Sequence, residues 1–94
     1  MYNRILRQMR EKVRKRQYVM TLHAEEEMSD DGFTIFDVER AILTGEIIER
    51  QSDRQLSEWK YLIAGKSVDN QSLVVVAKVG ATDKLVIITV YGTE

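Results

Sequence analysis

The sequence predicts an α+β domain in which N-terminal helices pack on one antiparallel sheet of about four strands. Helical periodicity is confined to the first half of the chain, and short runs of β-branched and aromatic residues fill the C-terminal third. The connectors between these runs are short. Because parallel strands need a crossover of a dozen or more residues, neighbouring strands should form antiparallel hairpins.

Two of the runs have the pattern of central strands. In residues 73–77 and 85–88 the odd and the even positions are all apolar. Successive side chains of a strand point to opposite faces, so this pattern is typical of strands covered on both faces. Residues 51–57 are polar and are expected to form a loop. The strands that we expect are 46–50, 59–65, 73–79 and 84–91.

The first expected helix, residues 3–16, is amphipathic. Ile5, Leu6, Met9 and Val13 share one face, and the positions between them are mostly basic or polar. A short extended segment is expected to follow at 18–22.

Two further helices are expected at 22–29 and 34–44. Thr21 is a suitable N-cap for the first of them. Thr34 with Asp37 resembles a capping box for the second, and Gly45 should end it in a left-handed C-cap.

Length and composition limit the classes of function. The 94 residues fit one domain, with a basic helix at 1–17 and a core at 18–94. There is no cysteine and one histidine, so disulfides and thiolate zinc sites are excluded, and neither a metal nor a cofactor is expected. No apolar run is long enough for a membrane helix and no signal core is present, so a cytoplasmic location is expected.

Charge is unevenly distributed along the chain. Residues 1–20 carry seven basic side chains against one acid, whereas residues 23–58 carry eleven acids against three arginines. This asymmetry indicates either contact with a polyanion or pairing of the two segments with each other. The basic face of the first helix is either a solvated surface or an RNA-binding surface that includes Arg7, Arg10 and Arg14, with membrane binding as a weaker third reading.

Isolated polar residues are the candidates for chemistry, because no strong short motif is present. Histidine often acts as a general acid or base, and His23 is expected in the first turn of the second helix; the alternative is that it hydrogen-bonds a neighbouring strand. Strand parity directs Lys60 to the face opposite Trp59. Lys78 and Tyr91 end later strands, and Arg54 precedes Trp59. Cations and a tyrosine on an uncovered sheet face suit phosphodiester cleavage, although each lysine could equally be a solubilising residue and Tyr91 a core aromatic.

Several pieces together resemble a family of small bacterial domains, domain of unknown function 4258, over residues 18–91. The pieces are His23-Ala24 with Met28, Asp37-Val38 with Ala41-Ile42, Gly45 to Glu49, Tyr61 with Gly65, Val74 to Val76 with Lys78, and Val86 to Tyr91.

The family is similar to the RelE and BrnT toxins of bacterial toxin–antitoxin pairs. The resemblance implies a RelE-like fold and metal-independent cleavage of messenger RNA. It also implies a small zinc-finger, helix-turn-helix antitoxin as partner. The family motifs match at His23, Lys78 and Tyr91, whereas Arg54 and Lys60 are assigned by position.

The leading hypothesis is therefore a toxin-like endoribonuclease that attacks mRNA through the 2′-hydroxyl. The alternative is a non-catalytic domain that binds RNA or protein, such as a degenerate toxin or a homodimeric adaptor. Glu27 and the acidic middle of the chain favour this alternative.

Overall fold

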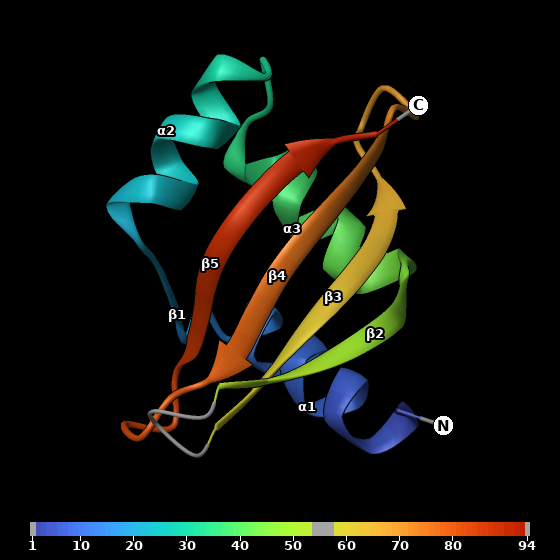
Figure 1. The fold of residues 1–94 in the computed structure, drawn as a ribbon. Helices are drawn as coiled ribbons and strands as arrows, with labels where there is room; N and C mark the ends of the chain where they lie inside the picture. Colours follow the sequence, from blue (N-terminus) through green and yellow to red (C-terminus); the bar gives the residue numbers. More distant parts are fainter. Residues whose placement is uncertain (1, 54–57, 94) are drawn as a thin grey trace.

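A sheet built mostly from the C-terminal half of the chain carries helices on one side (Figure 1). The computed structural model describes residues 2–53 and 58–93, without the side chain of Asp53. The α+β prediction is confirmed. The elements in chain order are α1 (Asn3–Arg14), β1 (Tyr18–Met20), α2 (Leu22–Asp30), α3 (Ile35–Thr44), β2 (Glu46–Asp53), β3 (Glu58–Lys66), β4 (Ser72–Val79) and β5 (Leu85–Gly92).

The sheet has five strands in the order β1-β5-β4-β3-β2. The last four strands form three antiparallel pairs, as predicted, and β4 is central. The expected count of about four strands, all antiparallel, was incomplete, because β1 joins the sheet parallel to β5. This short strand covers part of an edge of β5 that would otherwise expose unpaired backbone groups.

Strand β2 is longer than predicted and includes half of the expected loop. Gln51 pairs with Lys60 and Ser52 with Trp59, so the polar residues 51–53 continue the strand. Polar residues are compatible with this position because β2 is an edge strand whose side chains largely face solvent. The rest of the predicted loop, 54–57, lies outside the described residues.

The core lies between the sheet and its helices. Its members are fully or nearly buried, and removing this apolar surface from water is the main force holding the layers together. They include Met9 and Val13 from α1, Val38, Ala41 and Ile42 from α3, Ile63 from β3, Leu73, Val75 and Ala77 from β4, and Leu85, Ile87 and Val90 from β5.

Two glycines allow α3 to lie very close to β3. A Cβ atom at Gly65 would lie 2.5 Å from the carbonyl oxygen of Ala41, and one at Gly45 would lie 2.3 Å from that of Ala64. Gly45 has φ −88°, so the predicted left-handed C-cap is wrong. Glycine is needed there because backbone atoms leave no room for a side chain.

The predicted helix N-termini are confirmed. The Thr21 hydroxyl accepts a hydrogen bond from Ala24 N–H at 3.1 Å. Asp37 accepts from Thr34 N–H at 2.8 Å and from Val68 N–H at 2.9 Å, which ties α3 to the β3–β4 turn. Burial acts to raise the pKa of Asp37, but these hydrogen bonds and that of the Thr34 hydroxyl outweigh it and hold the pKa below 3.8.

Candidate functional site

The side of the sheet away from the helices is the uncovered face (Figure 1); none of the helices in the described ranges lies on it. Strand register arranges its side chains in three rows, because directly opposite residues share a face. The rows are Lys60, Lys78 and Val86; Leu62, Val76 and Thr89; and Ala64, Val74 and Tyr91. Lys60 joins the first row by continuation of the Tyr61–Ala77 pairing.

The first row carries the charged cluster of the uncovered face, which consists of Glu58, Lys60 and Lys78. Lys78 Nζ lies 2.6 Å from Glu58 Oε2, and both side chains are partly buried. Glu58 Oε2 is shielded from solvent and accepts no hydrogen bond of good geometry within the described part of the chain. Two opposed lysines repel each other, and the carboxylate beside them offsets this repulsion.

Tyr91 does not join this cluster. Val74 pairs with Tyr91 whereas Lys78 pairs with Val86, so the two side chains are four positions apart along β4. At the usual rise of a strand this is about 13 Å. The apolar row of Leu62 and Val76 lies between them, so Lys78 and Tyr91 cannot contact the same phosphate.

His23 does not join the charged cluster either. It lies in the first turn of α2, as predicted, on the helix side of the sheet, and its side chain is 66 % exposed. His23 Nε2 is 3.1 Å from Glu27 Oε1. The structure therefore does not bring His23 to Lys60, Lys78 or Tyr91.

An acidic residue of α2 and the acidic residue that follows the helix complete the edge of β5 beyond β1. Glu27 Oε1 accepts a hydrogen bond from Val90 N–H at 3.3 Å, and Asp31 Oδ2 accepts one from Gly92 N–H at 2.8 Å. The Thr21 hydroxyl donates to the Ile88 carbonyl at 3.1 Å. Glu27 thus has a structural role, since it satisfies a backbone donor that no neighbouring strand reaches.

The basic residues of α1 fall into two groups. Arg10 is directed inward, where Nε donates to Ile42 O at 3.0 Å and Nη2 donates to Gly45 O at 2.7 Å. Lys12 is buried and pairs with Asp83 at 2.9 Å. By contrast, Arg7 and Arg14 are exposed, with Arg14 3.9 Å from Glu11. Of the three arginines of α1 that were predicted to bind phosphate, Arg10 is therefore occupied by contacts within the fold.

The exposed side of α1 borders a groove of about 540 Å³. The groove reaches the β4–β5 turn, at the same end of the sheet as Lys78. The predicted RNA contact Arg54 lies outside the described residues. The residues that line the groove are Arg4, Arg7, Gln8, Glu11, Lys12, Lys15, Gln17 and Asp83.

An arginine–aromatic cluster lies where β2 and β3 meet the start of α1; we define it as Tyr2, Arg50, Trp59 and Tyr61. Arg50 Cζ is 3.9 Å from the centre of the Trp59 ring and 5.9 Å from that of Tyr2. Tyr2 and Tyr61 pack edge to face with ring centres 6.0 Å apart. The cluster is on the helix side, so Trp59 and Lys60 present side chains to opposite faces of β3.

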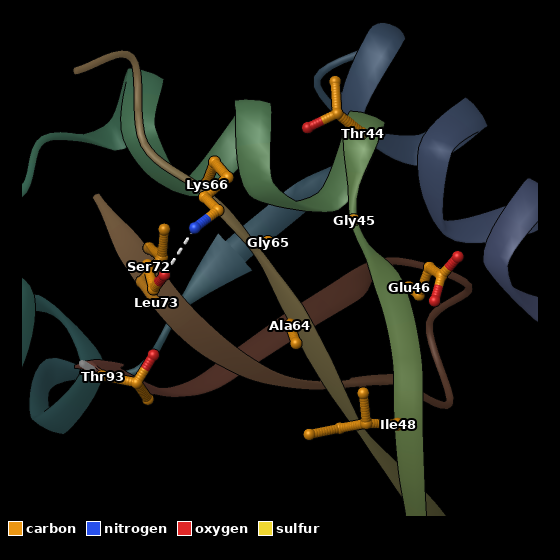
Figure 2. Close-up of a pocket in the computed structure, with 10 residues that line it drawn as sticks. All are labelled: Thr44, Gly45, Glu46, Ile48, Ala64, Gly65, Lys66, Ser72, Leu73 and Thr93. Carbon is orange, nitrogen blue, oxygen red and sulfur yellow. Dashed lines mark hydrogen bonds between the residues drawn. The ribbon is translucent and has the colours of Figure 1, made fainter. Parts of the chain in front are cut away.

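A different pocket, of about 370 Å³, opens at the other end of the sheet (Figure 2). Figure 2 shows Lys66 directed at Ser72 on the neighbouring strand, with Nζ 2.7 Å from Oγ. Glu46 points away from Lys66 in this view. Lys66 has its polar partner already, and the pocket holds no arrangement of acid, base and free cation like that of the charged cluster.

Two observations concern metals and membranes. Within residues 2–53 and 58–93, no three acidic or histidine side chains gather as metal ligands would. In the same ranges, none of the helices combines the length and apolarity needed to cross a bilayer.

Comparison with protein families identifies the core of the chain. A family model for a domain of unknown function, DUF4258, matches residues 20–92. The chain belongs to this family. The DUF4258 match includes the last four strands and leaves α1 outside it, so the basic helix is an addition to the family core. No curated protein and no solved structure matches the chain.

Sequence reasoning missed Glu58 and the pairing of Arg50 with Trp59. Glu58 shares the parity of Lys60, so strand alternation could have directed both to the uncovered face if β3 had been predicted one residue earlier. The Arg50–Trp59 contact depends on the β2–β3 register, in which Arg50 pairs with Tyr61. The sequence has no signal that fixes this register.

Proposed function

We propose that this DUF4258 protein is a toxin-like endoribonuclease, similar to the RelE and BrnT toxins, that cleaves messenger RNA without a metal ion. One observation carries the proposal: the Glu58 carboxylate lies 2.6 Å from Lys78 on the uncovered face, in the row beside Lys60. A carboxylate with two cations supplies a base and charge stabilisation for phosphodiester cleavage.

In the proposed reaction, Glu58 removes the proton from the ribose 2′-hydroxyl. The 2′-oxygen attacks phosphorus, and the ammonium groups of Lys78 and Lys60 stabilise the negative charge of the phosphorane. The bond to the 5′-oxygen then breaks, and Lys60 donates a proton to that oxygen. The products are a 2′,3′-cyclic phosphate and a 5′-hydroxyl.

The exposed arginines of α1 are proposed to hold the RNA. Arg4, Arg7 and Arg14 line or flank the 540 Å³ groove, and Lys12 with Asp83 connects this groove to the β4–β5 turn. Lys78 lies near the same turn on the other face of the sheet, so an RNA strand bound along α1 would pass around this end to reach the charged cluster. Most of this affinity would be electrostatic, and it compensates for a chain that is slightly acidic overall.

The proposal includes a cognate antitoxin of the zinc-finger, helix-turn-helix type. Strand β2 is an edge strand, and its Ile48 side chain is 57 % exposed. An extended segment of a partner could pair with this edge by backbone hydrogen bonds and restrict access to the uncovered face from the β2 side.

The test combines growth and cleavage. We expect the full chain to arrest growth when expressed alone, and the protein encoded by its neighbouring gene to relieve the arrest. The purified protein should cleave single-stranded RNA in EDTA. Glu58→Gln and Lys78→Ala should each lower the rate at least about 100-fold, the usual contribution of a general base or of a charge-stabilising group.

Lys66→Ala is the matched lysine control, because Lys66 lies at the other end of the sheet, and it should retain cleavage. Tyr91→Phe and His23→Ala test the assignment made from sequence. A loss in Tyr91→Phe as large as that in Glu58→Gln would move the active site to the other end of the uncovered face. Absence of both growth arrest and cleavage would overturn the proposal.

A second candidate function, protein binding without catalysis, is favoured by the same open edge of β2. In that case the chain pairs with itself or a partner through β2 and leaves RNA intact. Light scattering of the purified protein separates the two: a monomer that cleaves RNA excludes a homodimeric adaptor.

A further inference from the structure

We propose that the arginine–aromatic cluster binds an unpaired nucleobase of single-stranded RNA next to the cleavage site. This inference rests on the proposed function in that RNA is the ligand. It adds a subsite of its own, built from Tyr2, Arg50, Trp59 and Tyr61.

The cluster offers flat, partly exposed surfaces for stacking. Trp59 is 46 % exposed, and the Arg50 guanidinium lies over its ring at 3.9 Å. Arg50 Cζ is also 5.9 Å from the centre of the Tyr2 ring. Aromatic rings and arginine planes are the groups on which proteins stack bases that are not paired.

A hollow beside Arg50 and the rings of Tyr2 and Tyr61 has the size and charge for one base, although Trp59 does not line it. Its volume is about 250 Å³, below the range of about 300–1,000 Å³ typical of pockets that enclose a whole ligand. Two of its lining residues are arginines and none is acidic, which favours a ligand that carries phosphate. The lining residues are Tyr2, Arg4, Ile5, Gln8, Arg50 and Tyr61.

The hollow is a neighbour of the groove along α1. Arg4 and Gln8 line both, so a strand whose base enters the hollow has its next phosphates beside Arg4 and Arg7. A stacking platform that continues into a cationic groove is the usual arrangement for binding single strands.

The platform and the charged cluster both include residues at the start of β3. Trp59 and Lys60 are consecutive and present their side chains to opposite faces, with Lys60 in the row of Lys78. Trp59 and the Glu58–Lys78 pair thus lie at the same end of the sheet on opposite faces, and an RNA strand bound at both would cross from one face to the other. The subsite would select which phosphodiester bond reaches the cluster.

Trp59 makes the test direct because it is the only tryptophan of the chain. The full chain carrying Glu58→Gln, which should not cleave, is titrated with a ten-residue single-stranded oligoribonucleotide. We expect saturable quenching of Trp59 fluorescence. An oligomer with the same phosphates and abasic sugars should bind about 5- to 150-fold more weakly, which corresponds to one stacked base.

Variants separate stacking from charge. In anisotropy measurements with labelled RNA, Arg50→Ala and Trp59→Ala should weaken binding by a similar factor, whereas Trp59→Phe should keep most of it. Lys66→Ala removes one positive charge at the far end of the sheet and is the control for Arg50→Ala. Thermal melting confirms that each variant is folded. The quenching experiment does not depend on these variants, because it uses a protein in which Tyr2, Arg50, Trp59 and Tyr61 are all unchanged.

Three outcomes would overturn the inference. The first is RNA binding of equal strength with and without bases. The second is unchanged affinity in Trp59→Ala and Arg50→Ala. The third is a Trp59 signal that responds to the antitoxin but not to RNA. In each of these cases, the proposed endoribonuclease function stands if cleavage still depends on Glu58. If the protein neither cleaves nor binds RNA, both the proposed function and the base-binding subsite are overturned.

Discussion

The guanidinium of Arg10 reaches across 35 residues of sequence to donate a 2.7 Å hydrogen bond to the carbonyl oxygen of Gly45. The same side chain donates to Ile42 O, so it satisfies two carbonyls at the C-terminal end of α3 and carries positive charge where the helix dipole favours it. One residue of the basic helix is therefore a structural clamp between α1 and α3.

Arg10→Ala should destabilise the fold without removing a phosphate contact. The two hydrogen bonds involve a charged donor, so we expect a loss of about 1.5–3 kcal/mol in the free energy of unfolding. Arg7→Ala is the matched control, because Arg7 is exposed one turn away, and its effect should stay within about 0.5 kcal/mol. Urea denaturation of both variants measures the difference; equal stabilities would contradict the clamp.

Gly65→Ala tests the close approach of α3 and β3. The added Cβ would lie 2.7 Å from the Cα of Ala41, and backbone rather than a flexible side chain must move. We expect a cost of several kcal/mol, at or above the usual range of about 1–3 kcal/mol for overpacking. Gly32→Ala is a useful contrast, because a Cβ atom there would have no neighbour within 4 Å. Its effect on stability would come only from the positive φ of 75°, which alanine disfavours. A Gly65→Ala variant as stable as the wild type would show that the two layers separate easily.

Asp37 should make stability depend on acid pH. Its pKa in the folded protein lies below the ordinary value of 3.8, so the charged form is favoured by folding. This contribution is present above the ordinary pKa and is lost progressively as the pH falls toward and through the folded pKa. In Asp37→Asn this component is absent. The stability difference between wild type and variant should therefore shrink between about pH 5 and pH 2 in denaturation measurements; a constant difference would contradict the assignment.

RNA binding should depend steeply on salt through the exposed arginines of α1. For single strands the slope of log affinity against log salt changes by about 0.7 for each phosphate contact. Arg4→Ala with Arg7→Ala should therefore flatten the slope by about 1.4. The double variant Arg40→Ala with Lys66→Ala has the same net charge and changes two exposed residues away from the groove. Equal slopes in the two double variants would mean that α1 does not hold the RNA.

Local features of this fold were predictable from sequence because they depend on residues near each other in the chain. Thr21 and Asp37 act as helix caps through contacts within three residues, and strand alternation alone directs Lys60 and Lys78 to the uncovered face. Lys60, Lys78 and the exposed Arg7 and Arg14 could be proposed in this way.

Features that depend on register or on distant pairing were not predictable. The separation of Tyr91 from Lys78 follows from how β4 pairs with β5, including an irregularity between Val76 and Ala77. The inward direction of Arg10 depends on where α3 ends. In both cases the determining partner lies far away in sequence, and composition gives no indication of it.

The parallel pairing of β1 with β5 has a consequence for synthesis on the ribosome. Thr21, next to β1, bonds a residue 67 positions later, and β1 itself has no strand to pair with until Leu85 to Ile87 have emerged. Contacts of such long range are formed late, since the intervening chain must first be brought together. A nascent chain therefore lacks its five-stranded sheet until residues 85–87 have left the ribosome, and the backbone groups of β1 stay unpaired while the intervening residues are made.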